Sequence, residues 1–278
     1  MVRINKRADG PEVLLTLGIV HRDLLIKAYN DNPLTYTSQA GVKNKEIISL
    51  KFDRDIYAAT IVKDNLIEDQ HEKCCFCEAK FLDTSYGDVE HFRPKAAYMK
   101  SGDRRLTYPG YYWLAYDWSN LLFSCEKCNR SYKKNQFPLN NENTRKPYYE
   151  HANDILNEDR LLIDPTIENP NEFFEFKGED PVPIAENIKG KTSIRAFNLK
   201  RLNSTRLAYL KTLKASLTFA QIDKYDENEI QMAIMALNIT RIELVELIDE
   251  GVKLFNSAAK NTEKFAYCVR CNFPNLPI

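Results

Sequence analysis

Three Cys-x-x-Cys pairs restrict the fold of this chain more than any other feature of its sequence. They use six of the seven cysteines and are Cys74 with Cys77, Cys125 with Cys128, and Cys268 with Cys271. Two such pairs on tight turns can direct four thiolates at one ion, and four sulfur ligands close a tetrahedral zinc site with no open position. We therefore expect the first two pairs to form one structural zinc site, although the segment between them is longer than in a compact zinc ribbon.

The other interpretations of the cysteines are weaker. A thioredoxin-like redox pair needs a strand and helix context that neither of the first two pairs has, and the cysteines are too few for a secreted disulfide scaffold. The third pair has no fourth-ligand partner pair in the sequence. We interpret Cys268 and Cys271 as thiols in a tail, and a half-site completed by a second chain is the alternative.

The composition is that of an ordinary globular protein, with 44% hydrophobic and 28% charged residues over 278 positions. No apolar run approaches the ~20 residues of a membrane helix, and the first residues do not resemble a signal segment. We therefore expect a cytoplasmic protein with no membrane partner.

Charge is distributed unevenly along the chain. Thirty-nine cationic and thirty-nine acidic residues give a formal net charge of zero, which argues against a protein that coats nucleic acid with its whole surface. Between His91 and Lys134, however, cationic residues clearly outnumber acidic ones. A solvated charged face would explain such a run, but here the run coincides with the cysteine and histidine motifs.

Periodicity and breakers predict an α+β fold that is mostly helical. We expect three regions: an N-terminal helical region over 1–70, a core over 71–140 and a mostly helical C-terminal region over 141–278. Within them we predict a helix over 12–29, a loop over 30–51, a helix from the cap Asp53 to about His71, a short hairpin over 78–92 with its turn near 85–87, and a short basic helix at Asn129.

Two stretches of the core, EHFRPK and DWSNLLFSCEKCNRSYKKNQFP, resemble HNH endonucleases, in which a ββα-metal finger holds one catalytic divalent ion. The flanking stretches IYAATIVKDNLIEDQHEKCCFCE, LLIDPTIENPNEFFEF and IRAFNLKRLNSTR look like the HNH subunit of Septu-type anti-phage systems. This resemblance implies a nuclease that is controlled by a partner ATPase of the ABC or SMC-like kind.

The resemblance also implies roles for individual residues. His91 matches the general base, and Glu90 matches an acidic metal ligand that is usually aspartate. Asn120 matches the middle motif residue and would hydrogen-bond to backbone or to His91. Asn129 matches the last, where many relatives have histidine. Asp88 is either a further metal ligand or a group that supports one.

The chemistry of these residue types agrees with that assignment. A histidine with an unperturbed pKa of ~6.5 can take a proton from water near neutral pH, and Mg²⁺ or Mn²⁺ bound by carboxylate and amide oxygens can stabilise a leaving oxygen. Because Cys128 and Asn129 are adjacent, a zinc ion that holds Cys128 would also position the catalytic ligand.

The nearby cations are candidates for binding the phosphates that flank the cleaved bond, without reading bases. They are Arg93, Lys95, Arg130, Lys133 and Lys134. The chain has no Gly-x-x-x-x-Gly-Lys loop, so it does not carry a P-loop ATPase of its own. Two other functions stay open: a stand-alone HNH restriction-type nuclease, and a non-catalytic zinc-stabilised module that binds nucleic acid.

Overall fold

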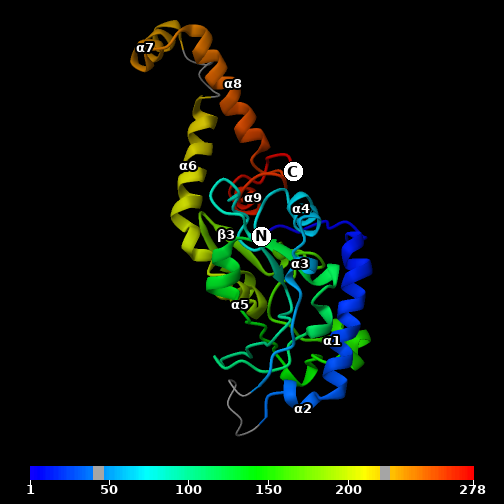
Figure 1. Ribbon diagram of the computed structural model, residues 1–278. Helices are drawn as coiled ribbons and strands as arrows, with labels where there is room; N and C mark the ends of the chain where they lie inside the picture. Colours follow the sequence, from blue (N-terminus) through cyan, green and yellow to red (C-terminus); the bar gives the residue numbers. More distant parts are fainter. Residues whose placement is uncertain (40–46, 220–225) are drawn as a thin grey trace. The chain divides into compact units, whose positions relative to one another are not determined.

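The computed structural model describes residues 1–39, 47–219 and 226–278, and these residues form two compact units. The first unit comprises Met1–Phe174 and Pro183–Asn198, and the second comprises Glu175–Val182 and Leu199–Ile278. Helices and two separate two-stranded sheets build them, so the predicted α+β class is confirmed (Figure 1). The three regions predicted from the sequence were defined by motif positions, and these two units are defined by contacts within the fold. The three regions therefore stay a prediction.

The elements of the first unit are mostly short helices around one small sheet. In chain order they are η1 Leu14–Gly18, α1 Ile19–Asp31, α2 Pro33–Tyr36, α3 Arg54–Tyr57, α4 Thr60–Asp69, β1 Asp88–His91, η3 Tyr112–Leu114, η4 Trp118–Asn120, β2 Leu121–Ser124, η5 Lys127–Lys133, η6 Glu142–Thr144, η7 Tyr149–Asn157, η8 Pro170–Glu172, η9 Ile184–Glu186 and α5 Ile188–Ala196.

The first predicted helix is confirmed, since η1 and α1 form one continuous helical segment. A proline at the first position of α2 follows directly and begins a new helix. Part of the predicted loop over 30–51 lies outside the described residues, namely 40–46.

The second predicted helix is wrong as a single element. Asp53 caps α3 as expected, because its side chain accepts a hydrogen bond from Asp55 N at 2.9 Å. The chain then leaves the helical path at Ala58 and Ala59 and begins α4 separately. The break lets α3 follow its own direction, and α4 buries Val62 and Leu66 completely while leaving Ile61 on the surface.

The strand that ends at His91 has a different partner from the one predicted. Instead of forming a hairpin within 78–92, β1 pairs antiparallel with β2, with Asp88 opposite Ser124 and His91 opposite Leu121. All four residues of β2 are buried, so pairing with this distant strand covers far more apolar surface than a local turn. Gly87, at φ +64°, ends the local turn against the ring of Phe123.

Gln70 joins the end of α4 to the first cysteine pair and to the outer edge of β2. Its Oε1 accepts a hydrogen bond from Phe123 N at 2.8 Å, and its Nε2 donates to Phe123 O at 2.7 Å and to Lys73 O at 3.0 Å. Cys75 N donates to the same Phe123 carbonyl at 3.0 Å. The Gln70 side chain thus makes, at the outer edge of β2, hydrogen bonds of the kind that a neighbouring strand would make.

The second unit is mainly helical. Its elements are η10 Leu199–Leu202, α6 Asn203–Phe219, α7 Glu227–Leu237, α8 Arg241–Ser257 and α9 Ala266–Asn272, with most of β3 Phe174–Lys177 and β4 Asp180–Pro183. Helices α6 and α8 pack side by side (Figure 1). Leu213, Ala258, Ala259 and Val269 form a buried cluster.

The third cysteine pair belongs to helix α9 of this unit and is not loose chain. Cys268 is buried, with its Sγ 3.5 Å from Gly178 O, while Cys271 Sγ accepts a hydrogen bond from Phe176 N at 3.4 Å. The interpretation of this pair as tail thiols is therefore corrected: the sulfurs hold α9 against the turn and strand of β3.

No helix within the described ranges combines the length and the apolar character needed to cross a bilayer.

Replacing Gln70 with leucine tests the junction of α4, the first cysteine pair and β2. Gln70→Leu leaves Phe123 N without its partner and removes one of the two hydrogen bonds that Phe123 O accepts, so we expect the free energy of unfolding to fall by about 1–3 kcal/mol. Urea denaturation measures the change. The matched Gln231→Leu, at an exposed position of α7, should unfold like wild type, and equal stability of both variants would contradict the role of Gln70.

Candidate functional site

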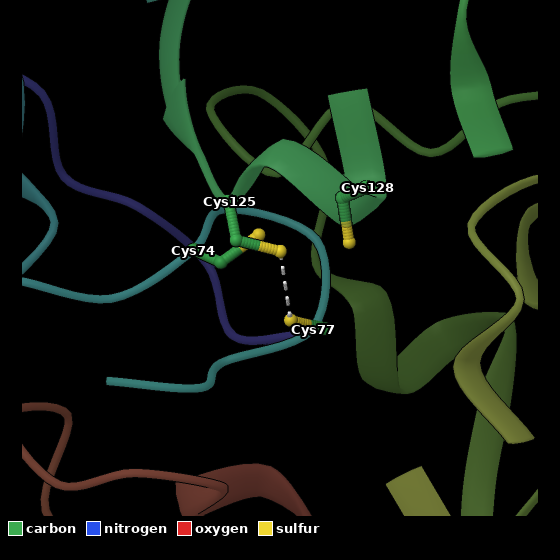
Figure 2. A group of neighbouring side chains, drawn as sticks. All are labelled: Cys74, Cys77, Cys125 and Cys128. Carbon is green, nitrogen blue, oxygen red and sulfur yellow. Dashed lines mark hydrogen bonds between the residues drawn. The ribbon is translucent and has the colours of Figure 1, made fainter. Parts of the chain in front are cut away.

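The first two cysteine pairs come together as predicted. The Sγ atoms of Cys74, Cys77, Cys125 and Cys128 all lie within 4.8 Å of one another, and those of Cys77 and Cys125 are 3.9 Å apart (Figure 2). Zinc bound tetrahedrally at Zn–S distances of about 2.3 Å would separate its sulfurs by about 3.8 Å. Burial raises the pKa of the Cys74 thiol, so a bound cation would supply the charge that stabilises its thiolate. The group can therefore hold a metal such as zinc.

The first two cysteine pairs lie at junctions between elements of the first unit. The first pair lies on a tight turn after α4, in which Glu78 N donates to Cys74 O at 3.0 Å. Cys125 follows β2 directly, and Cys128 lies in η5, where Asn129 N donates to Cys125 O at 3.1 Å. The four sulfurs thus join the end of β2 and the start of η5 to a turn far away in the sequence.

An open pocket of about 400 Å³ lies beside β1 and η5 in the first unit. Seven of the predicted site residues line it, namely Asp88, Glu90, His91, Lys95, Asn129, Arg130 and Lys134. His91 and Asn129 therefore line one common cavity.

The hydrogen bonds of His91 define which ring nitrogen carries the proton. Nε2 lies 2.9 Å from Ala115 O, and a carbonyl oxygen only accepts, so Nε2 must donate. Nδ1 then keeps its lone pair and lies 3.3 Å from Lys95 Nζ. Burial, together with the charges of Lys95 and Lys133, lowers the pKa of His91 well below its usual range, so that the imidazole is neutral near pH 7.

Asn120 holds two backbone segments together rather than contacting His91. Its Oδ1 accepts from Arg93 N at 2.8 Å, and its Nδ2 donates to Arg93 O at 3.0 Å and to Leu114 O at 3.2 Å. Leu114 precedes Ala115, whose carbonyl binds His91 Nε2. Of the two expected contacts, backbone or His91, the structure has the backbone.

Glu90 is buried and forms an ion pair. Lys133 Nζ lies 2.5 Å from Glu90 Oε1 and also donates to His91 O at 3.0 Å. Burial raises the pKa of Glu90, and the charge of Lys133 opposes that rise. Because the Lys133 side chain is fully buried, it does not fit the predicted role in binding flanking phosphates; its ammonium compensates the Glu90 carboxylate instead.

Arg93 is the second predicted phosphate ligand that the structure places elsewhere. Its Nε donates to Glu158 Oε2 at 2.9 Å, its Nη2 donates to Ile155 O at 3.2 Å, and the side chain is buried. This arrangement ties the loop after β1 to η7. A guanidinium that is paired inside the fold is not available to a phosphate, so this prediction is corrected as well.

Asp88 and Arg130 form a pair at the pocket. The Arg130 guanidinium donates from Nε to Asp88 Oδ2 at 2.8 Å and from Nη2 to Asp88 Oδ1, and this pairing raises the pKa of Arg130. Asn129 precedes Arg130 and, among the residues the structure describes, no protein group hydrogen-bonds to its side chain. Lys134 is exposed.

Three polar lining residues were missed by sequence reasoning. Arg54 and Tyr57 reach the pocket from α3, and the Tyr57 ring centroid lies 4.7 Å from that of His91 in an edge-to-face contact. Asn135 follows Lys134. No spacing in the sequence connects α3 to the motif, because α3 and β1 are far apart in the chain. Asn135 had one signal, since it directly follows the basic run.

Comparison with known proteins gives two similar curated proteins, both named "Septu protein PtuB". The protein from Bacillus mycoides (strain KBAB4) is 42% identical over 156 residues, which cover 56% of this chain and 52% of that protein. The protein from Bacillus thuringiensis is 28% identical over 181 residues, which cover 63% and 54%. This chain spans about half the length of these relatives. The predicted resemblance to a Septu component is confirmed at this level.

No protein-family model matches the chain, and no solved structure matches it.

Alanine substitutions within one turn test the four-sulfur site. Cys77→Ala removes one of the four sulfurs, so we expect the zinc content of the purified protein, measured by mass spectrometry of the metal, to fall from about one ion per chain to well below one. The matched control is Cys75→Ala, a buried thiol in the same turn that is not among the four. Equal zinc content in both variants would contradict the site.

Proposed function

We propose that this chain is a metal-dependent HNH endonuclease that hydrolyses phosphodiester bonds in DNA, and that it acts in a Septu-type anti-phage defence system under the control of a partner ATPase. The observation that carries the proposal is the common pocket of His91, Glu90 and Asn129. A pocket that joins a neutral imidazole to oxygen ligands has the parts that metal-assisted hydrolysis of a phosphodiester needs.

In this proposal β1, β2 and η5 form the ββα-metal finger. The two antiparallel strands and the following helical turn occur in the required order, with His91 at the end of the first strand and Asn129 in the helix. The four-cysteine group would act as a structural zinc site at the base of the finger, because it fixes the junction between β2 and η5.

The catalytic Mg²⁺ or Mn²⁺ would be held by the Glu90 carboxylate and the Asn129 amide oxygen, and it would supply positive charge to the phosphate and to the leaving oxygen. The donor set fits a hard cation, because both groups line the pocket. Asp88 has both carboxylate oxygens on Arg130, which favours a supporting role over direct ligation.

His91 would act as the general base through Nδ1. The hydrogen bond from Nε2 to Ala115 O fixes the ring and leaves the Nδ1 lone pair toward Lys95 and the pocket. A water molecule that loses its proton to Nδ1 becomes the hydroxide that attacks phosphorus. The positive charge that develops on the ring is stabilised by the hydrogen bond from Nε2 to the Ala115 carbonyl oxygen.

The flanking phosphates would be bound by Lys95, Arg130 and Lys134, all at the pocket.

Control by a partner ATPase is supported by the two similar proteins named as Septu components and by the absence of a P-loop from this sequence. Such a partner would supply the nucleotide chemistry that controls the nuclease.

Removing the proposed base tests the nuclease function. We expect His91→Ala to lower the rate of plasmid cleavage with Mg²⁺ or Mn²⁺ by about 10²–10⁴-fold, because no other group would take the proton from water. The assay is run with the protein alone and with its co-expressed ATPase and nucleotide. The control His151→Ala, a partly exposed histidine outside the pocket, should cleave like wild type.

Cleavage that survives His91→Ala would remove the assigned base. Cleavage by wild type without any partner would instead favour a stand-alone nuclease. DNA binding without cleavage under every condition would favour a non-catalytic module.

The metal dependence of cleavage tests Asn129. Asn129→Ala removes one proposed oxygen ligand, so we expect the Mn²⁺ concentration for half-maximal cleavage to rise about tenfold or more while the bound zinc is unchanged. The control Asn143→Ala, exposed in η6, should keep the wild-type metal curve. An unchanged curve for Asn129→Ala would exclude Asn129 as a ligand.

A further inference from the structure

The charges that line the pocket are not balanced. Its two carboxylates are already paired, Asp88 with Arg130 and Glu90 with the buried Lys133. Arg54, Lys95 and Lys134 line the same pocket, and within the described parts of the chain none of them is in an ion pair. The net positive charge facing the cavity is therefore available to an anion.

Arg54 is the least expected of these cations. It is the first residue of α3 and its side chain is exposed, while Asp53 before it caps that helix by accepting a hydrogen bond from Asp55 N. A guanidinium with no carboxylate partner can bind two oxygens of one phosphate through parallel hydrogen bonds.

Lys95 lies in a mostly buried position beside the proposed base. Its Nζ is 4.4 Å from the centroid of the Tyr57 ring, 5.7 Å from that of Phe52, and 3.3 Å from His91 Nδ1. Burial lowers the pKa of Lys95 to about 8, with Glu90 opposing the shift and the charges of Lys133 and Arg54 adding to it. The ammonium remains mostly protonated at pH 7, so it donates to His91 Nδ1.

We propose that Arg54 and Lys95 form the subsite for the scissile phosphate, so that Lys95 contacts the cleaved phosphate rather than a flanking one, and that a phosphate oxygen frees His91 Nδ1 by accepting the hydrogen bond that Lys95 gives it. This inference rests on the proposed nuclease function. It assigns a substrate contact to α3, which lies outside the HNH-like motif, and it makes the base available only when a phosphodiester occupies the pocket.

The exchange moves no electrons and breaks no covalent bond. Lys95 keeps its three protons and turns one N–H from the imidazole to an anionic oxygen, which is a better acceptor. The Nδ1 lone pair is then free to accept the proton of the attacking water. Tyr57, which contacts both Lys95 and His91, keeps the two groups on one side of the pocket.

Binding to a short DNA duplex, and separately to its single strand, tests Arg54 without requiring cleavage. Without added divalent metal, Arg54→Gln should bind roughly tenfold more weakly than wild type, and the slope of log affinity against log salt should decrease by about one because one phosphate contact is lost. Arg54→Lys should recover part of the affinity. Arg22→Gln, at a partly exposed arginine of α1 outside the pocket, should bind like wild type.

The outcomes separate this inference from the proposed function. Wild-type affinity and salt slope in Arg54→Gln would overturn the subsite, even if cleavage depends on His91. Loss of affinity in Arg54→Gln with no cleavage by wild type under any condition would support the subsite and reject the nuclease. Failure of wild type to bind either form of DNA would overturn both.

Chemical modification of histidine tests the contact between Lys95 and His91. Methionine at position 95 fills the same volume between Tyr57 and Phe52 without an N–H, so Lys95→Met should leave Nδ1 uncovered. We expect diethylpyrocarbonate to modify His91 several-fold faster in Lys95→Met than in wild type, while the rate at His151 stays the same. An unchanged or slower rate at His91 would overturn the proposed masking of the base.

Discussion

The four sulfurs of Cys74, Cys77, Cys125 and Cys128 connect two stretches of chain that are far apart in the sequence. On one side they hold the turn after α4, and on the other they hold the end of β2 and the start of η5. The β1–β2 pairing, the position of Asn129 and the wall of the pocket all depend on that junction. Gln70 reinforces it from the outer edge of β2, where its amide satisfies the backbone of Phe123.

Two buried ion pairs determine which cations near the site remain available to a ligand. Lys133 compensates Glu90, and Arg93 pairs with Glu158, so two cations of the basic run are structural rather than exposed. A charge taken out of water without a partner is strongly unfavourable, which explains why each of these groups has an opposite charge within contact distance. The cations left over at the pocket are the ones that can bind an anion.

The candidate base is assembled from four different segments. His91 ends β1, Ala115 O fixes its Nε2, Lys95 approaches its Nδ1, and Tyr57 of α3 packs against its ring. Asn120 does not touch the imidazole but holds the backbone next to the Ala115 carbonyl. Orientation of the ring is thus a property of the surrounding fold, and small displacements of these segments would change the direction of the Nδ1 lone pair.

The sequence alone determined the residue types of the site and the elements that carry them. The Cys-x-x-Cys spacing predicted the sulfur group, and the motif placed His91 at a strand end and Asn129 in a helix, because these features depend on local geometry. Only the tertiary structure decided the partner of β1, the break between α3 and α4, and which cations face solvent. Those outcomes follow from burial and long-range pairing, for which residues near in sequence carry no signal: Arg54 reaches the pocket, while Arg93 and Lys133 turn inward to meet carboxylates.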